Sequence, residues 1–195
     1  LEATECKARL VTLEPGSRPQ YADVLTAGTT HLVAVERPGV ASDGYHHNGK
    51  GEIISPYLAS LDELYIAGRT GGLVTLGVGD GGNELGMGNV GQAAEAFLSP
   101  GKPYGCVIPS DFCICAGVSN WGAYALAALL SLLHGRNLLP EPPVVSDILD
   151  RIVTAGAVDG VTGRASPTVD NLPRAWEDTI YKTLYGIAED CRRPS

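Results

Sequence analysis

Two carboxylic acids and an amide stand inside a glycine-dense stretch near the middle of the chain. The stretch covers residues 77–88 and carries Asp80, Asn83 and Glu84. Glycine allows positive φ angles and lets a ligand approach the main chain closely, while carboxylates transfer protons or bind divalent cations. These residue types predict a small-molecule site in which Asp80, Asn83 and Glu84 carry the chemistry.

Polar residues also follow two other segments that are predicted to be strands. Glu36 and Arg37 end one of them, and Ser119 and Asn120 follow the other. Arg37 offers a planar fork that suits a carboxylate, and a helix capped by Ser119 or Asn120 would attract an anion at its N-terminus. Because ligands bind beyond the carboxyl ends of parallel strands, these residues and the glycine-dense stretch are expected to line one crevice.

Strand-like and helix-like segments alternate along the chain, which predicts an α/β fold. We expect a Rossmann-like, three-layer α/β/α arrangement with a mostly parallel sheet, built as a single domain of residues 1–195. In the last helix Trp176, Ile180, Leu184 and Ile187 are predicted to share one face. The predicted strands cover residues 8–14, 31–36, 73–76 and 111–116, and the predicted helices cover residues 17–27, 56–67, 90–98, 121–134, 146–155 and 173–191.

The glycine-dense stretch also matches the G-x-G-x-x-G pattern of dinucleotide-binding loops, at Gly77, Gly79 and Gly82. That pattern requires an acid at the next strand end for the ribose hydroxyl, and the chain has none at the required distance. Asp80 would also repel phosphate. We therefore expect neither a nicotinamide nor a flavin cofactor. A plain turn would explain the glycines but not the two acids.

Other residues that can do chemistry have simpler structural interpretations. His46 and His47 are adjacent, so in a strand-like segment they point apart and are not expected to share a metal ion; a solvated loop is the simpler expectation. Asp159 and Asp170 lie in turns, where aspartate is common for local hydrogen bonding. No serine occupies a nucleophile elbow, and so no Ser-His-Asp arrangement is predicted.

Composition excludes several classes of partner. The formal net charge is −8, and without a clustered basic face a nucleic-acid partner is not expected. The longest apolar run, residues 123–133, is shorter than the roughly 20 residues that span a bilayer, so no membrane partner is expected either. Five cysteines without a CxxC pair favour a reducing compartment. The first residues mix charges of both signs, and no targeting segment is predicted there.

Several short strings resemble one known family, the C-terminal domain of the mitochondrial D-glutamate cyclases, formerly a domain of unknown function. The most specific is Gly-Asp-Gly-Gly-Asn-Glu-Leu-Gly-Met-Gly within residues 77–88, and the resemblance extends from about residue 8 to about residue 184. The other matching strings are Glu-Arg-Pro-Gly at residues 36–39, Asp-Gly at residues 43–44, Ser-Asn-Trp-Gly at residues 119–122 and Asp-Gly-Val-Thr at residues 159–162.

The resemblance implies a hydro-lyase of the mitochondrial matrix that converts D-glutamate to 5-oxo-D-proline and water, with magnesium or manganese as cofactor. Domains of this family begin with a further strand and helix carrying a Glu-Thr-Asp-Gly-Pro string. That string is missing before residue 1, so the fold is expected to be truncated at its N-terminus. If the missing residues complete the pocket, this chain is folded but inactive.

The expected mechanism needs a base, an acid and a charge clamp. Glu84 or Asp80 is the candidate base, with Asn83 beside them, and the amides of Gly81 and Gly82 are the candidate oxyanion donors.

The substrate α-carboxylate is assigned to Arg37 and to the helix start at Ser119 and Asn120. Glu36, Asp80 and Asp159 are the alternative metal ligands, and the sequence does not choose between proton transfer and metal binding. D-Glutamate is the expected small-molecule partner, and the oligomeric state stays open. The alternative function is a non-catalytic or differently catalytic domain that binds a small anion or nucleotide, followed by a pure interaction module.

Overall fold

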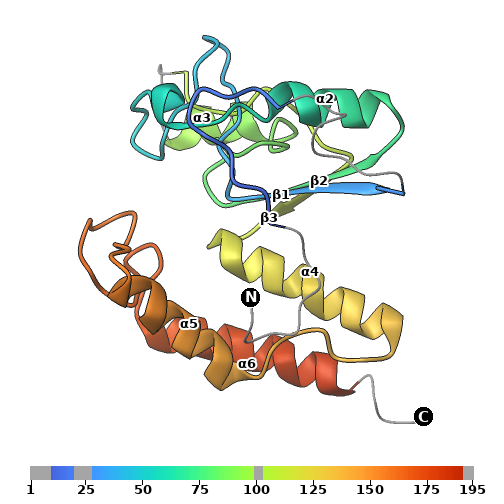
Figure 1. The fold of residues 1–195 in the computed structure, drawn as a ribbon, viewed down its shortest axis with the longest axis vertical. Helices are drawn as coiled ribbons and strands as arrows, with labels where there is room; N and C mark the ends of the chain where they lie inside the picture. The colour runs from blue at the N-terminus through green and yellow to red at the C-terminus, as the bar shows by residue number, and fades with distance from the viewer. Residues whose placement is uncertain (1–9, 20–27, 99–102, 191–195) are drawn as a thin grey trace. The chain divides into compact units, whose positions relative to one another are not determined.

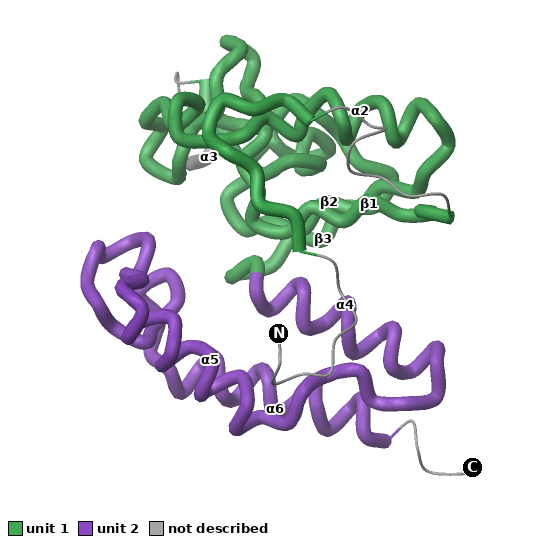
Figure 2. Tube along the Cα trace, in the orientation of Figure 1, with its two compact units in different colours: residues 1–119 green, residues 120–195 purple. Residues whose placement is uncertain are grey.

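The structure is a computed structural model that describes residues 10–19, 28–98 and 103–190. The chain forms two compact units, Leu1–Ser119 and Asn120–Ser195 (Figure 2). We call them unit 1 and unit 2 and describe each by itself. The expectation of a single domain stays a prediction. Among the described residues, no helix combines the length and the apolar character that crossing a membrane requires.

Unit 1 contains a three-stranded parallel sheet in the order β1-β2-β3 (Figure 1). The strands are β1 (His31–Val35), β2 (Val74–Gly79) and β3 (Phe112–Cys115). β2 is central and mostly buried, as expected for a parallel strand rich in valine. The strands end at a common level, since Val35 pairs with Val78 and Gly79 pairs with Cys115. The predicted α/β class and parallel sheet are confirmed.

Among the described residues, the helices of unit 1 are the 3-10 helix η2 (Ser55–Tyr57), α2 (Asp62–Thr70) and α3 (Gly91–Leu98). Figure 1 shows α2 and α3 on the same side of the sheet. Tyr65 of α2 packs in a buried core with Leu85 and Ile108. The single helix predicted over residues 56–67 is divided into η2 and α2. Leu58 interrupts it, because its backbone is extended, with φ −118° and ψ 148°.

Unit 2 consists of α4 (Ser119–His134), whose first residue still belongs to unit 1, α5 (Pro142–Thr154) and α6 (Arg174–Asp190). Its core holds Ala128, Leu139, Tyr181 and Ala188. The buried face of α6 carries Glu177, Tyr181 and Ala188.

The face that Trp176, Ile180, Leu184 and Ile187 were predicted to share on α6 is only partly buried. Trp176 and Ile187 are 56% and 45% exposed, although their spacing matches the helical period. The buried face is set instead by Tyr181, whose ring meets Tyr124 edge to face with centroids 4.8 Å apart. Where a helix carries apolar residues on more than one face, aromatic packing of this kind favours burial of the face that bears the aromatic ring.

Two further predictions concern the beginning of the chain. The strand expected at residues 8–14 is absent from residues 10–14, where Leu10 is 76% exposed and has no strand to pair with among the described residues. Residues 8–9 lie outside the described residues, as does most of the helix expected at residues 17–27. The helices α4 to α6 belong to unit 2, so the three-layer arrangement stays a prediction.

Candidate active site

The glycine-dense stretch continues β2 and then folds back over the end of that strand. A Cβ atom placed on Gly77 would lie 2.7 Å from the carbonyl carbon of Gly86, so the two backbones are in direct contact. Gly82 and Gly86 have positive φ angles of 83° and 90°, which residues with a side chain rarely adopt. The glycines therefore let the loop pack on itself, whereas the sequence pattern predicted that they admit a ligand.

Glu84 is buried by this folding and is only 2% exposed. Its Oε1 atom accepts the backbone N–H groups of Asp80 at 3.0 Å and Gly81 at 2.8 Å. Its Oε2 atom is buried without a hydrogen-bond partner among the described residues. A buried carboxylate oxygen without a partner is costly, and such an oxygen indicates that a proton, a cation or a ligand completes the site.

Two other carboxylates lie close to Glu84. Glu36, Asp80 and Glu84 each offer one oxygen, and these three atoms lie within 4.8 Å of one another. We call these residues the carboxylate cluster. Glu36 and Asp80 directly follow β1 and β2, which pair in parallel and end side by side. The sheet therefore brings them together as predicted, and Glu84 reaches the same place from the loop.

The backbone of Glu36 is strained where it leaves β1. Its φ angle is 50°, and its N–H group donates to the carbonyl oxygen of Val78 at 3.1 Å. A positive φ at a residue other than glycine costs of order 1 kcal/mol or more, and it persists where the surroundings impose it. This bend is what turns Glu36 out of the strand at the level of Asp80.

Asp80 also joins the cluster to the start of α4. Its Oδ2 atom accepts the N–H group of Ser119 at 2.8 Å and the Ser119 hydroxyl at 3.1 Å. The helix is thus capped by a carboxylate from another element, and the prediction that Ser119 caps its own helix is wrong. Asn120 opens unit 2 and lines a cavity of about 100 Å³ inside that unit.

Asn83 is 8% exposed and connects the glycine-dense loop to two other segments. Its Nδ2 atom donates to the carbonyl oxygen of His47 at 2.9 Å, and its Oδ1 atom accepts the Tyr104 hydroxyl at 3.1 Å. A Cβ atom on Gly81 would lie 2.6 Å from that hydroxyl. Asn83 and Gly81 together therefore fix the position of the Tyr104 hydroxyl.

Tyr104 belongs to the site but was not identified from the sequence. Burial raises its pKa to about 12, and the charges of Glu84, Asp80 and Glu36 act in the same direction. The phenol therefore stays protonated at neutral pH and acts as a hydrogen-bond donor. Tyr104 follows no predicted strand and matches no motif, so only the three-dimensional fold reveals its place.

The predicted oxyanion donors are both in the loop. The N–H group of Gly81 already donates to Glu84. The carbonyl of Gly82 accepts the N–H group of Cys106 at 2.9 Å, which pins the loop from the other side. Stabilisation of an oxyanion by these two amides stays a prediction, and for Gly81 it would require Glu84 to give up one hydrogen bond.

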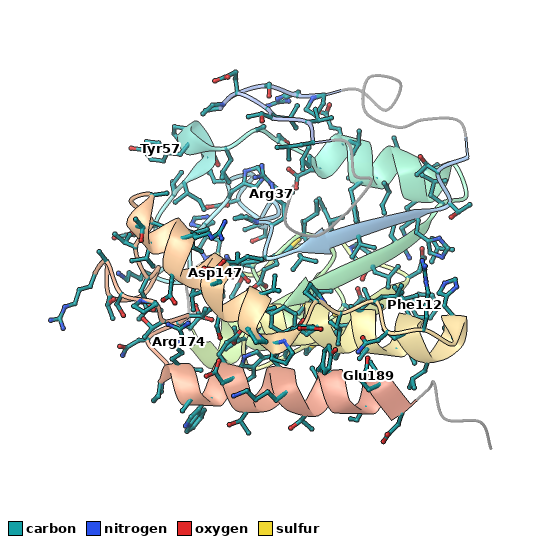
Figure 3. The ribbon with its side chains drawn as sticks, turned by 60° about the horizontal axis from the view of Figure 1, so that its bottom comes forward. Arg37, Tyr57, Phe112, Asp147, Arg174 and Glu189 are labelled. Carbon is teal, nitrogen blue, oxygen red and sulfur yellow. The ribbon has the colours of Figure 1, made fainter. Side chains whose placement is uncertain are left out.

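Arg37 lies next to the cluster in sequence, but its guanidinium group contacts the segment before α2 (Figure 3). Nη2 donates to the carbonyl oxygen of Ala59, and Nε is buried without a partner among the described residues. Burial lowers the pKa of Arg37, and the nearby charge of Asp62 opposes this effect. Its role as a clamp for the substrate carboxylate stays a prediction.

The two adjacent histidines are buried, with exposed fractions of 8% for His46 and 4% for His47, and the expected solvated loop is wrong. Nε2 of His46 lies 2.7 Å from an Asp62 oxygen, whereas Nε2 of His47 lies 3.0 Å from an Asp43 oxygen. They point apart, as predicted, and each is buried because it has its own carboxylate partner.

Asp159 has a structural environment inside unit 2 and is 3% exposed. One carboxylate oxygen accepts the N–H groups of Val161 and Thr162 and the Thr162 hydroxyl, and the other accepts the Thr168 hydroxyl and the N–H group of Asn171. Burial would raise the pKa of Asp159, but these hydrogen bonds outweigh it and lower the pKa well below its usual range. Both oxygens are occupied, and this favours the local role over metal binding.

Comparison with known proteins shows which family the chain is similar to. The model of the family described as D-glutamate cyclase-like, C-terminal, matches residues 3–185. The chain belongs to the D-glutamate cyclase-like C-terminal family. It is also 43% identical to the mitochondrial D-glutamate cyclase of Homo sapiens over 113 residues, which is 57% of this chain and 18% of that protein. The aligned part thus spans less than a fifth of that relative.

The D-glutamate cyclase-like match confirms the resemblance seen in the short strings, and the matched range includes every predicted site residue. Of these, Glu36, Asp80 and Glu84 are brought together by the fold, and Asn83, which precedes Glu84 in the chain, accepts the Tyr104 hydroxyl. In this D-glutamate cyclase-like chain the carboxylate cluster, with its unpartnered oxygen, is therefore the candidate active site.

Proposed function

We propose that the chain is a lyase that converts D-glutamate to 5-oxo-D-proline and water at the carboxylate cluster. Membership of the D-glutamate cyclase-like family and the name of the human relative support this reaction. The observation that carries the proposal is the buried carboxyl group of Glu84: its Oε2 atom has no partner among the described residues, and one of its oxygens lies within 4.8 Å of oxygens of Glu36 and Asp80. That relative is named as mitochondrial, and we propose the mitochondrial matrix for this protein.

The reaction balances without a net change in protons. The amino nitrogen of D-glutamate forms a bond to the side-chain carboxyl carbon, and one carboxyl oxygen leaves as water. The ammonium group releases two protons, and the departing oxygen takes up two. The protein therefore needs one group that accepts a proton from nitrogen and one that delivers a proton to oxygen.

Asp80 and Tyr104 suit these two tasks. Asp80 is exposed and so reaches a substrate, although Glu84 remains the alternative base. Tyr104 keeps its proton, because its pKa is raised to about 12, and it lies beside the loop that carries both acids. We assign the first proton transfer to Asp80 and the delivery of a proton to Tyr104.

As the alternative to proton transfer by Asp80, we propose that a magnesium or manganese ion is held by Glu36, Asp80 and Glu84. Carboxylate oxygens are the ligands these ions prefer, and oxygens bound to one such ion at about 2.1 Å lie roughly 3–4 Å apart, compatible with the 4.8 Å limit of the cluster. When bound, such an ion supplies positive charge that stabilises charge developing on the substrate carboxyl group. Glu84 takes the place of the predicted ligand Asp159, whose oxygens are occupied.

Titration with Mn²⁺ tests the metal proposal. The full-length protein should bind Mn²⁺ with a defined stoichiometry, and Glu84→Gln should weaken the affinity at least about tenfold. Equal affinities for the two proteins would contradict this ligand set. The competing function, a nucleotide or small-anion site, is distinguished by its ligand: thermal stabilisation by ATP or NAD but not by D-glutamate would favour it.

The reaction is tested by incubating full-length protein with D-glutamate or L-glutamate and measuring 5-oxoproline by chiral chromatography. We expect product from D-glutamate and far less from L-glutamate. Asp80→Asn should reduce the rate by about 100-fold or more, the usual contribution of a general base. Undiminished turnover in Asp80→Asn would overturn the assignment of the base, and lack of product in magnesium and in manganese would overturn the function.

A further inference from the structure

A second group of chemically reactive side chains lies in unit 1 and shares no residue with the carboxylate cluster. The segment of residues 46–54 folds back on itself, because His47 pairs with Ile53 and the N–H group of Ile54 donates to the carbonyl oxygen of His46 at 2.8 Å. This turn places Ser55, the first residue of η2, beside the ring of His46.

The three side chains form a continuous hydrogen-bonded line. The Ser55 Oγ atom lies 3.2 Å from Nδ1 of His46, and Nε2 of His46 lies 2.7 Å from Oδ2 of Asp62. The Ser55 oxygen also accepts the backbone N–H group of His46 at 2.8 Å. The backbone therefore fixes the serine oxygen, and its hydroxyl hydrogen is free to point at the imidazole.

Asp62 sets the tautomer of the imidazole. Burial would raise its pKa, but hydrogen bonds from His46, Ser60 and the Val40 amide outweigh that effect and lower it. The ionised carboxylate only accepts hydrogen bonds, so neutral His46 carries its hydrogen on Nε2. Nδ1 then has a free electron pair that faces the Ser55 hydroxyl. This is the arrangement in which an imidazole activates a serine as a nucleophile.

The group opens into a hollow of about 480 Å³, which is within the usual size range of small-molecule sites. Ser55, His46 and Asp62 are among the residues that line it. Val40, Leu58 and Ile66 add apolar surface that suits a short acyl chain. Ser55 is partly exposed, whereas His46 and Asp62 are buried behind it, so a ligand in the hollow meets the serine first.

We propose that Ser55 is a nucleophile, activated by His46 and Asp62, that accepts the acyl group of small carboxylic esters. The Ser55 oxygen forms a bond to the ester carbonyl carbon while its proton moves to Nδ1 of His46. The bond between that carbon and the alcohol oxygen breaks, and the departing alcohol takes the proton from Nδ1. Water releases the acyl group by the same transfers and restores the serine. Such an arrangement is recognised by geometry and not by chain order.

The test uses the full chain and two probes, p-nitrophenyl acetate and an alkyl fluorophosphonate. Intact-mass measurement should show one added group per chain, and peptide mapping should place it on Ser55. Ser55→Ala should remove this label, and His46→Gln should slow labelling by about 100-fold or more. Labelling that is absent from the wild-type chain, or equally fast in Ser55→Ala, would overturn the proposal.

Ser60→Ala is the matched control. The Ser60 hydroxyl donates to the same Asp62 oxygen at 2.7 Å but lies outside the line from Ser55 to His46. This variant should keep the label on Ser55.

Ser55→Thr retains a hydroxyl and its hydrogen bonds, so it separates loss of folding from loss of the nucleophile. A folded Ser55→Thr protein that is labelled on residue 55 supports the proposal. Transfer of the label to another residue in Ser55→Ala would contradict it.

Discussion

At the scale of single residues, one buried oxygen atom determines how the site is interpreted. Oε2 of Glu84 has no hydrogen-bond partner within the part of the chain that the structure describes, while Oε1 accepts two backbone N–H groups. The sequence predicted that Asp80 and Glu84 are functional because acids are unusual in a glycine-rich loop. It did not predict that the glycines exist to accommodate Glu84 itself. The contact between the glycines and the Glu84 side chain depends on how tightly the loop folds, and the composition of the loop does not determine this.

Gly79→Ala tests this relation. The added methyl group would lie 2.6 Å from both Cδ and Oε2 of Glu84, so the carboxylate must move. We expect the free energy of unfolding to fall by about 1–3 kcal/mol, as for other overpacked sites, and turnover of D-glutamate to fall with it. Urea denaturation and the 5-oxoproline assay measure the two effects.

Gly160→Ala is the control for this substitution. No atom lies within 4 Å of the position where its Cβ would be placed. Its unfolding free energy should change by no more than about 0.5 kcal/mol. Equal effects of the two substitutions would show that the space beside Glu84 is not limiting.

Tyr104→Phe tests the residue that the sequence did not reveal. It removes the hydroxyl that donates to Asn83 and leaves the ring in place. If the phenol delivers a proton, kcat should fall by about 100-fold, whereas KM should change little. Because the pKa of Tyr104 is raised to about 12, the wild-type rate should show no titration of this phenol between pH 6 and about 10. An unchanged kcat in Tyr104→Phe would remove it from the mechanism.

At the scale of elements, the ends of parallel strands account for most of what could be predicted. β1 and β3 match the predicted ranges to within one residue at each end, because short apolar runs bounded by turn residues are distinctive. β2 continues to Gly79, three residues past its predicted end. Glycine is a poor strand former, and here the strand continues because the backbone of Gly86 packs directly on Gly77.

The loop around Asp159 permits a test of an element in unit 2. The folded pKa of Asp159 is lowered, so its stabilisation is complete above the unfolded pKa of about 4 and is lost as the pH falls through the lower folded value. Asp159→Asn should reduce the unfolding free energy at pH 7 by about 2 kcal/mol, since it weakens hydrogen bonds to a charged group.

The difference between wild type and Asp159→Asn should shrink as the pH is lowered below about 4. Urea unfolding followed by tryptophan fluorescence reports on this unit, because both tryptophans of the chain, Trp121 and Trp176, lie in unit 2. A difference that stays constant from pH 7 to pH 2.5 would show that the carboxylate charge is not what holds the loop.

At the scale of the whole molecule, the sequence was most informative where a long string matched a family. The family match over residues 3–185 confirms that inference. Long-range contacts were the least predictable, because periodicity describes one element at a time. The pairing of His46 with Asp62 and the approach of Tyr104 to Asn83 join segments 16 and 21 residues apart, and both were missed for this reason.

The most direct test of the central claim compares two acid-to-amide variants in the D-glutamate assay. Glu84→Gln replaces one buried carboxyl oxygen of the carboxylate cluster by an amide nitrogen. Asp147→Asn removes a charge from the surface of α5, where Asp147 pairs with Arg151 and its side chain is 55% exposed (Figure 3). Exposed pairs of this kind contribute little to stability.

Formation of 5-oxoproline from D-glutamate by full-length protein should fall by about 100-fold or more in Glu84→Gln. It should stay close to the wild-type rate in Asp147→Asn, and both variants should remain folded by circular dichroism. A folded Glu84→Gln protein that produces 5-oxoproline as fast as the Asp147→Asn protein would contradict the assignment of the carboxylate cluster as the active site.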